Sequence, residues 1–299
     1  MGAGQNVPRP GDRPVLRTRA PIVALNSINT NVAALIALES LSEINSQLSV
    51  TQNRISTGLK VASAKDDPAT WAIAQNERAQ LSALDAVTSS LQRGQSIADT
   101  AMTAGQQISD LLSQMRAKAL AATDASLTTA DRQALSDDYV SLRHQIDTIA
   151  SSASFDGVNL ISAGSSGAVH ALANADGTQT VDVAHLDLST GGAAISGTLA
   201  DLTGAVTSAD LANFDSAIQK VNAGVAKLGT GSNALDNQLS FVGKLQDTLT
   251  TSIGNLVDAD VAAESAKLQA LQVKQQLAIK ALSIANQAPS LLLSLFQSH

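Results

Sequence analysis

Carboxylates placed close together are the residues in this chain that come nearest to a catalytic pattern. Paired carboxylates can serve as general acid and general base, but that chemistry needs a nucleophile or a histidine partner beside them. Neither group of acids has such a partner nearby, whereas acidic residues near a helix N-terminus interact favourably with the helix macrodipole, and proline is tolerated in a first turn. The sequence therefore predicts that these residues begin long helices. They form two groups, Lys65, Asp66 and Asp67 before Pro68, and Asp258, Asp260 and Glu264.

The other residues that bear chemistry show no spacing typical of a site. No HExxH, GxSxG, P-loop or GxGxxG motif occurs, and the chain has no cysteine, so neither disulfides nor a thiolate-bound metal can hold the fold. His144 falls between Leu142 and Ile146 of an apolar repeat, which indicates a solvated or interhelical position. We therefore expect no metal, no cofactor and no enzymatic activity. The four histidines are His144, His170, His185 and His299.

The composition favours close-packed helices. Of 299 residues, 44% are hydrophobic but only 2% are aromatic, so a core must be built from Ala, Leu, Ile and Val. Only 15% of residues are charged and the net charge is -7, an acidic balance that disfavours nucleic acid as a partner. No apolar run approaches the roughly 18 to 20 residues of a membrane span, so no membrane insertion is expected.

Apolar residues recur at alternating spacings of three and four in four stretches, which is typical of coiled-coil helices. No proline interrupts the chain between Pro68 and Pro289, so this long middle is free to be helical. Two of the stretches follow a capping box, Thr128 to Asp131 and Thr207 to Asp210. The four repeats comprise Ile44, Leu48, Thr51 and Ile55; Leu135, Tyr139, Leu142, Ile146 and Ile149; Leu211, Phe214, Ile218, Val221, Val225 and Leu228; and Leu268, Leu271, Gln275, Ala278 and Leu282.

The centre of the chain differs, because the helical period lapses there and Gly, Ser and Thr increase. Residues 169–174 and 178–188 flank Ala175-Asp176-Gly177, which predicts a β-hairpin. The simplest fold is mainly α, a long antiparallel helical rod or coiled coil with a small β-hairpin tip and paired N- and C-terminal helices. The predicted segments are a disordered extension over 1–22, a terminal coiled-coil domain over 23–66 plus 259–299, and a core domain over 67–258 with helices 70–123, 128–152 and 207–256 and a β-rich tip at 162–204.

Several stretches resemble bacterial flagellins in the form typical of alphaproteobacteria. SAKDDPATWAIA (63–74) resembles the passage of the family from its inner region into the first outer helix, and RISTGLK (54–60) resembles its arginine-leucine-serine-serine-glycine turn. ALNSINTNV (24–32) is similar to the mature N-terminus, and FDGVNL (155–160) to the close of the second helix. VDADVAAES, ALSIANQAP and LLLSLF resemble the C-terminus, so the resemblance covers nearly all of residues 24–296.

The resemblance implies a structural subunit that polymerises with copies of itself into the flagellar filament used for swimming. Such a subunit is exported through the flagellar type III apparatus to the extracellular filament. In the family the terminal helices, here residues 25–55 and 262–296, pair as the inner domain, and residues 70–256 would form the outer core domain. Stacking of copies is expected to bury apolar residues of the inner domain. The expected interface residues are Leu38, Leu41, Ile44, Leu48, Ile55, Leu268, Leu271, Leu282, Leu293 and Phe296.

The resemblance also implies an export chaperone, a filament cap protein and a hook-filament junction protein as partners. The stretch that the innate immune receptor for flagellin recognises corresponds to SQMRAK (113–118) in this sequence. Arg116 is retained there, but Gln114 and Lys118 depart from the family pattern, so a weak receptor agonist is expected. The chaperone is expected on the apolar tail, at Leu277, Leu282, Ile284, Leu291 and Leu295.

Two other functions stay open on these grounds. A hook-filament junction protein shares the terminal coiled coils but caps the structure instead of extending it. A surface adhesin of the same fold would use residues 162–204, although that stretch has no aromatic residue on which a sugar could stack. Residues 1–22 have no counterpart in the family pattern, and both a native tail and a non-native leader are open as their origin.

Overall fold

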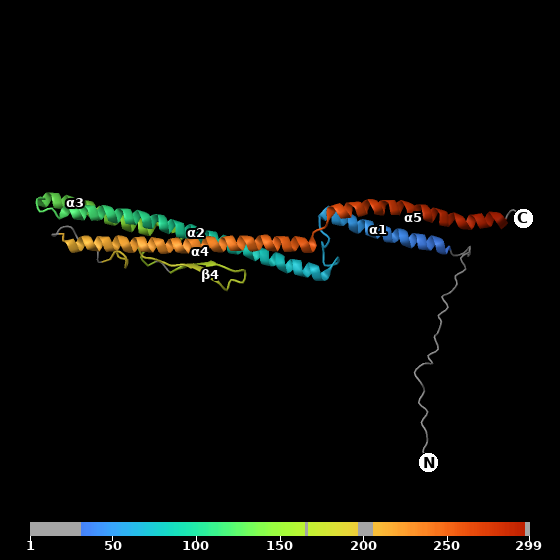
Figure 1. The fold of residues 1–299 in the computed structure, drawn as a ribbon, viewed down its shortest axis with the longest axis horizontal. Coiled ribbons are helices and arrows are strands. Elements are labelled where there is room, and N and C mark those ends of the chain that lie inside the picture. The colour runs from blue at the N-terminus through green and yellow to red at the C-terminus, as the bar shows by residue number, and fades with distance from the viewer. Residues whose placement is uncertain (1–30, 165–166, 197–205, 297–299) are drawn as a thin grey trace, which may run out of the picture. The chain divides into compact units, whose positions relative to one another are not determined.

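The computed structural model describes residues 31–164, 167–196 and 206–296, with side chains up to Gln287 in the last helix. The expected disordered extension over 1–22 lies outside the described residues. Long helices dominate the ribbon in Figure 1. The described residues also form two short antiparallel strand pairs. The elements in chain order are α1 (Val32–Thr57), α2 (Pro68–Ala122), α3 (Thr129–Ser152), β1 (Ser154–Phe155), β2 (Val158–Asn159), β3 (Val169–Leu172), β4 (Thr180–Val183), α4 (Ser208–Val257) and α5 (Val261–Phe296). The mainly helical fold class predicted from the sequence is confirmed.

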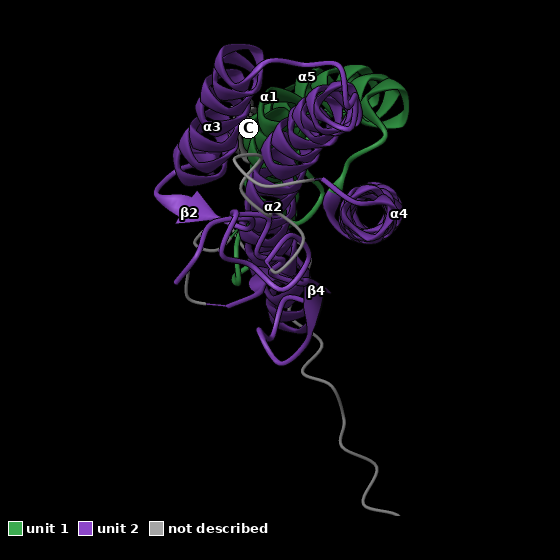
Figure 2. Cartoon of the chain, turned by 90° about the vertical axis from the view of Figure 1, so that its left-hand side faces the viewer, with its two compact units in different colours: residues 1–66, 258–299 green, residues 67–257 purple. Residues whose placement is uncertain are grey.

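The chain divides into two compact units, which Figure 2 colours separately. Unit 1 consists of residues 1–66 and 258–299 and pairs α1 with α5. Unit 2 consists of residues 67–257 and contains α2, α3, α4 and both strand pairs. The chain passes between the units from Asp66 to Asp67 and from Val257 to Asp258. Each passage therefore includes a member of one of the two acidic groups found in the sequence.

Both predicted capping boxes are present in unit 2. The Thr128 hydroxyl accepts from the Asp131 backbone N–H, and the Asp131 carboxylate accepts from the backbone N–H of Thr128 at 3.2 Å. The same reciprocal pair forms before α4, where the Asp210 carboxylate accepts from the Thr207 N–H at 2.8 Å. These bonds satisfy N–H groups that have no partner inside the helix, so the two boundaries are encoded within four residues of sequence.

The core of unit 2 lies between α2 and α4, with α3 folded back on α2. The two long helices run antiparallel, since Gln95 donates to Asp236 at 2.6 Å and Ser109 donates to Asn222 at 2.8 Å. Because aromatic residues are few, this core is mostly aliphatic and depends on alanine and glycine positions for close packing. One aromatic pair joins α3 to α4: the rings of Tyr139 and Phe214 meet edge to face with centroids 6.0 Å apart.

The predicted β-hairpin is formed by β3 and β4, which pair antiparallel from Val169 opposite Val183 to Leu172 opposite Thr180. Its strands are shorter than predicted, because the Asn174 side chain accepts from the N–H groups of Thr178 and Gln179 and closes the loop early. The hairpin lies along the middle of α2 and α4, since a Cβ added at Gly94 would meet Ala171 and one added at Gly231 would meet Val183. Glycine in each helix thus leaves room for a strand to approach.

Candidate functional site

The first candidate surface is the seam between α1 and α5 in unit 1. Buried and half-buried side chains recur on both helices at the predicted spacing of three and four. Thr51 on α1 is fully buried and Leu271 on α5 is 3% exposed. Leu271 is one of the predicted interface residues, and six more that face this seam are half-buried, namely Leu41, Ile44, Leu48, Ile55, Leu268 and Leu282. Part of the predicted interface is therefore used inside one subunit, and Leu293 and Phe296 lie outside the described side chains.

Polar contacts fix the register of this helix pair. Gln275 donates to Asn45 at 2.7 Å in the middle, and Asn31 donates to the carbonyl of Ala285 at 2.7 Å at one end. At the other end Arg54 forms an ion pair with Glu264 at 3.0 Å. The hydrogen bond from Arg54 holds the pKa of Glu264 below its ordinary value, and Lys267 acts in the same direction. The partners on α5 decrease in number as those on α1 increase, so the two helices are antiparallel.

Large apolar side chains that remain exposed form the second candidate surface in unit 1. Leu38, one of the predicted interface residues, is 54% exposed. Contiguous apolar patches are rare on soluble monomers and mark sites where another protein is bound. Several of these residues were missed by the sequence analysis, which followed a single apolar repeat on each helix. The exposed residues are Leu35, Ile36, Leu38 and Val50 on α1 and Val261, Val273, Leu277, Ile279 and Ile284 on α5.

The acidic residues of the first junction act as hydrogen-bond acceptors in local turns. The Asp66 carboxylate accepts from the backbone and side chain of Ser63, and the Ser63 hydroxyl bond is the main cause that lowers the pKa of Asp66. Asp67 is the N-cap of α2 and accepts from the N–H groups of Ala69 and Thr70. The Thr70 hydroxyl chiefly lowers the pKa of Asp67. Lys65 is exposed and makes no ion pair with a described residue.

At the second junction, Asp260 acts in the same way, whereas Asp258 takes part through its backbone. Asp258 forms an isolated antiparallel bridge with Leu59, and the next N–H, from Ala259, donates to the carbonyl of Gly58 at 2.8 Å. Asp260 accepts from the N–H groups of Ala262 and Ala263, both at 3.0 Å, and so begins α5. The carboxylates of Asp66, Asp67 and Asp260 thus stabilise turns and helix starts, which is a structural use of these groups.

The residues that correspond to the receptor-binding stretch lie on α2 in unit 2. Gln114 is exposed, whereas Arg116 and Lys118 are half-buried. Arg116 forms a two-pronged ion pair with Asp215 of α4, with contacts of 2.6 and 3.1 Å. Lys118 pairs with Asp138 of α3 at 2.5 Å. Both cationic side chains are therefore engaged within the subunit.

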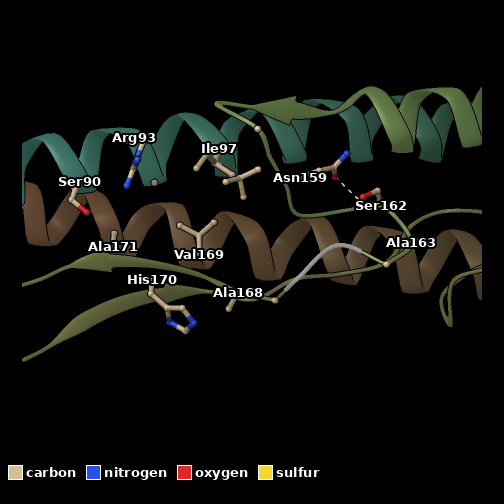
Figure 3. A pocket seen from close by; sticks show the side chains of 15 residues that line it. Ser90, Arg93, Ile97, Asn159, Ser162, Ala163, Ala168, Val169, His170 and Ala171 are labelled. Carbon is tan, nitrogen blue, oxygen red and sulfur yellow. Dashed lines mark hydrogen bonds between the residues drawn. The ribbon is translucent and has the colours of Figure 1, made fainter.

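A hollow of about 580 Å³ in unit 2 lies between α2 and the segments that carry β2 and β3 (Figure 3). Arg93 on its wall pairs with Asp156 at 3.6 Å, and Figure 3 shows that His170 points away from α2. His170 instead contacts Asp182 across the hairpin at 2.6 Å. His185 contacts the carbonyl of Ser162 at 3.0 Å, and His144 is exposed, while His299 lies outside the described residues.

Within residues 31–164, 167–196 and 206–296, no three His, Asp or Glu side chains gather where they could hold a metal ion. None of the helices in this same part of the chain combines the length and apolar character that a bilayer span requires. Exposed large apolar side chains occur in both units, for example Ile73 and Phe241 in unit 2, and in unit 1 they lie on α1 and α5.

Comparison with known proteins gives matches over most of the chain. A family model of the bacterial flagellin N-terminal helical region matches residues 28–166, and a model of the bacterial flagellin C-terminal helical region matches residues 211–296. Flagellin FljM of Caulobacter vibrioides is 50% identical over 275 residues, which cover 92% of this chain and 100% of FljM. Flagellin FljK of the same organism is 51% identical over 276 residues, with the same coverage. A flagellin of Brucella melitensis is 34% identical over 283 residues, covering 91% of this chain and 99% of its own.

Proposed function

The chain belongs to the bacterial flagellin family and is a structural subunit of the flagellar filament, and we propose that unit 1 joins each copy to its neighbours. The matches to filament subunits extend over both terminal regions, which disfavours a hook-filament junction protein or an adhesin. As a flagellin, the chain is not an enzyme and polymerises with copies of itself. The observation that supports the proposed interface is the exposed apolar surface of α1 and α5.

The energy available from this surface can be estimated from two residues. Leu277 is 63% exposed and Ile284 is 69% exposed in the single chain. Full burial of such a side chain contributes about 1.5–3 kcal/mol, so a neighbour that covers both would gain about 2–4 kcal/mol. Several such residues together offset the translational and rotational entropy lost when one copy joins another. A contact between two different faces that does not close into a ring extends as a helical assembly.

Electron microscopy of purified chain after addition of ammonium sulfate tests the proposal. We expect long filaments from the natural sequence and none, or far fewer, from a Leu277→Ser plus Ile284→Ser variant. The matched control is Gln276→Ser, which introduces the same residue at an exposed polar position of α5. Filaments from the double variant at the yield of the control would show that unit 1 does not assemble through these side chains.

The proposed partners of the filament subunit are an export chaperone, the filament cap and the hook-filament junction protein, and the proposed export route is the flagellar type III apparatus. Among the expected chaperone-binding residues, Leu277 and Ile284 are exposed, Leu282 faces the seam with α1, and Leu291 and Leu295 lie outside the described side chains. A chaperone that covers the exposed pair would also block assembly. Calorimetric titration with the chaperone should show weaker binding to the Leu277→Ser plus Ile284→Ser variant than to Gln276→Ser.

Weak activation of the innate immune receptor is proposed from the geometry at residues 113–118. Arg116 and Lys118 are held by Asp215 and Asp138, so neither cation is free for a receptor. A reporter-cell assay against an enteric flagellin checks this. Equal potency of the two flagellins would contradict the proposal.

A further inference from the structure

Helix α5 carries a second apolar seam that α1 does not cover. One row of α5 has the same three-and-four spacing as a coiled-coil seam, and all six of its residues are exposed: Ala266, Ala270, Val273, Leu277, Ala281 and Ile284. With 3.6 residues per turn, the centre of this row lies about 150° around the helix from the row that faces α1. A helix with two apolar seams on nearly opposite sides needs two helical partners, and unit 1 supplies only one of them.

Helix α1 presents a shallow groove on the side that faces away from α5. The groove has a volume of about 840 Å³, and Leu35 and Leu38 in it are 56% and 54% exposed. Two carboxylates, Glu39 and Glu43, lie on the same side of the helix. The outer face of α1 is therefore apolar at its start and acidic along its middle.

The charges beside the second seam of α5 have the opposite sign. Lys274 and Lys280 flank this seam, one on each side, and both are exposed. Among the described residues neither lysine forms an ion pair, and the same is true of Glu39 and Glu43. Two copies of α5 facing each other would bring lysines together, and two copies of α1 would bring carboxylates together, which is unfavourable.

On the basis of the proposed function, we infer that the second seam of α5 packs into the outer groove of α1 of a second copy of this chain. Lys274 and Lys280 then meet Glu39 and Glu43 of the neighbour. The two faces differ, so every added copy leaves one free α5 seam and one free α1 groove. This is the heterologous contact that an open helical assembly requires.

Exchange of the charges tests the inference in the full chain. One variant carries Lys274→Glu and Lys280→Glu, and the other carries Glu39→Lys and Glu43→Lys. Polymerisation is followed by light scattering at about 0.1 M salt, where charges about 10 Å apart still interact, and the critical concentration is measured by sedimentation. Each variant alone should show a critical concentration raised by about tenfold or more. That factor corresponds to about 1.4 kcal/mol per contact.

An equimolar mixture of the two variants is the decisive sample. If the inference holds, the acidic α5 of one variant meets the basic α1 of the other, and the mixture polymerises at close to the natural critical concentration. Lys244→Glu, the same change on an exposed lysine of unit 2, is the control and should leave assembly unchanged. Circular dichroism of each variant confirms that the helices are retained, since Glu43 also accepts a hydrogen bond from Gln47.

The possible outcomes separate this inference from the proposed function. If the natural chain forms no filaments, the proposed function itself fails. If the natural chain forms filaments and each variant alone polymerises equally well, the charge contact is refuted. If each variant fails and the mixture fails too, the lysines and carboxylates do not face each other in neighbouring copies, and the inference is overturned while the filament function stands.

Discussion

Replacement of Gly105 by alanine tests how closely α2 and α4 pack in unit 2. A Cβ atom added at Gly105 would lie 2.6 Å from Cγ2 of Val225 and 3.4 Å from Cδ1 of Leu188. The shorter contact requires movement, and a valine in a helix holds mainly one rotamer, so its methyl group cannot turn aside without strain. Relief therefore requires the two helices to separate slightly along their shared core.

Two opposing effects set the size of the change. Alanine is favoured over glycine in a helix interior by about 0.5–1 kcal/mol, whereas overpacking a core costs about 1–3 kcal/mol. We therefore expect Gly105→Ala to lower the free energy of unfolding of unit 2 by about 1 kcal/mol. Gly243→Ala in α4 is the matched control, because nothing lies within 4 Å of its added Cβ. That control should raise the free energy of unfolding by about 0.5–1 kcal/mol.

Urea unfolding followed by tryptophan fluorescence measures both variants. The chain has one tryptophan, Trp71 in α2, so the signal reports on unit 2. Val225→Ala removes the clashing methyl group, so the Gly105→Ala plus Val225→Ala double variant should recover about 1–3 kcal/mol relative to the sum of the single changes. Two results would refute a steric clash between residue 105 and Val225. One is stabilisation by Gly105→Ala equal to that of the control. The other is a double variant whose free energy of unfolding equals the sum of the two single changes to within about 0.5 kcal/mol.

Three further outcomes are expected. Asp67→Ala should lower the urea midpoint of unit 2 because two N-cap bonds are lost, whereas Lys65→Ala should not; equal effects would exclude the cap as the cause. Hydrogen bonds from Thr128 and Thr207 lower the pKa values of Asp131 and Asp210 below 3.8, so their stabilisation is complete above that value and is lost as the pH falls through the folded pKa values. When the pH is lowered below about 4, the urea midpoint measured by fluorescence should therefore decrease less for an Asp131→Asn plus Asp210→Asn variant than for the natural chain. Leu271→Ala should destabilise the α1–α5 pair by about 2–5 kcal/mol, seen as lost helical circular dichroism, whereas exposed Leu277→Ala should stay within about 0.5 kcal/mol.

Helix boundaries were predictable because their signals are local. The stretch predicted as helix 128–152 is observed as Thr129–Ser152, and the reason is the Thr128–Asp131 box, which needs only four residues to form. The position of the β3–β4 hairpin was not predictable in the same way. It depends on Gly94 and Gly231, which lie on two different helices and admit the strands only once those helices have paired.

The candidate surface was only partly predictable for a related reason. Periodicity identified Leu271 and its neighbours as a seam, and the terminal helices were expected to pair, but the sequence could not show which face of α5 meets α1. The row that contains Val273 and Leu277 has the same spacing, and only the observed pairing reveals which of the two rows stays open. Alanines at Ala266 and Ala270 weaken the apolar signal of the second row, which explains why it was missed in the sequence.

The pairing of the two chain ends has a consequence for the order of folding. Arg54 and Glu264 are 210 residues apart in sequence, so closing that loop in an unfolded chain costs about 5 kcal/mol of entropy. Folding of unit 2 removes most of this cost, because antiparallel α2 and α4 bring Glu77 to within 3.2 Å of Ser252 and leave only short segments before α1 and α5. We therefore expect α1 and α5 to pair last. A substitution that slows the folding of unit 2, in the middle of the sequence, should also slow the pairing of these two terminal helices.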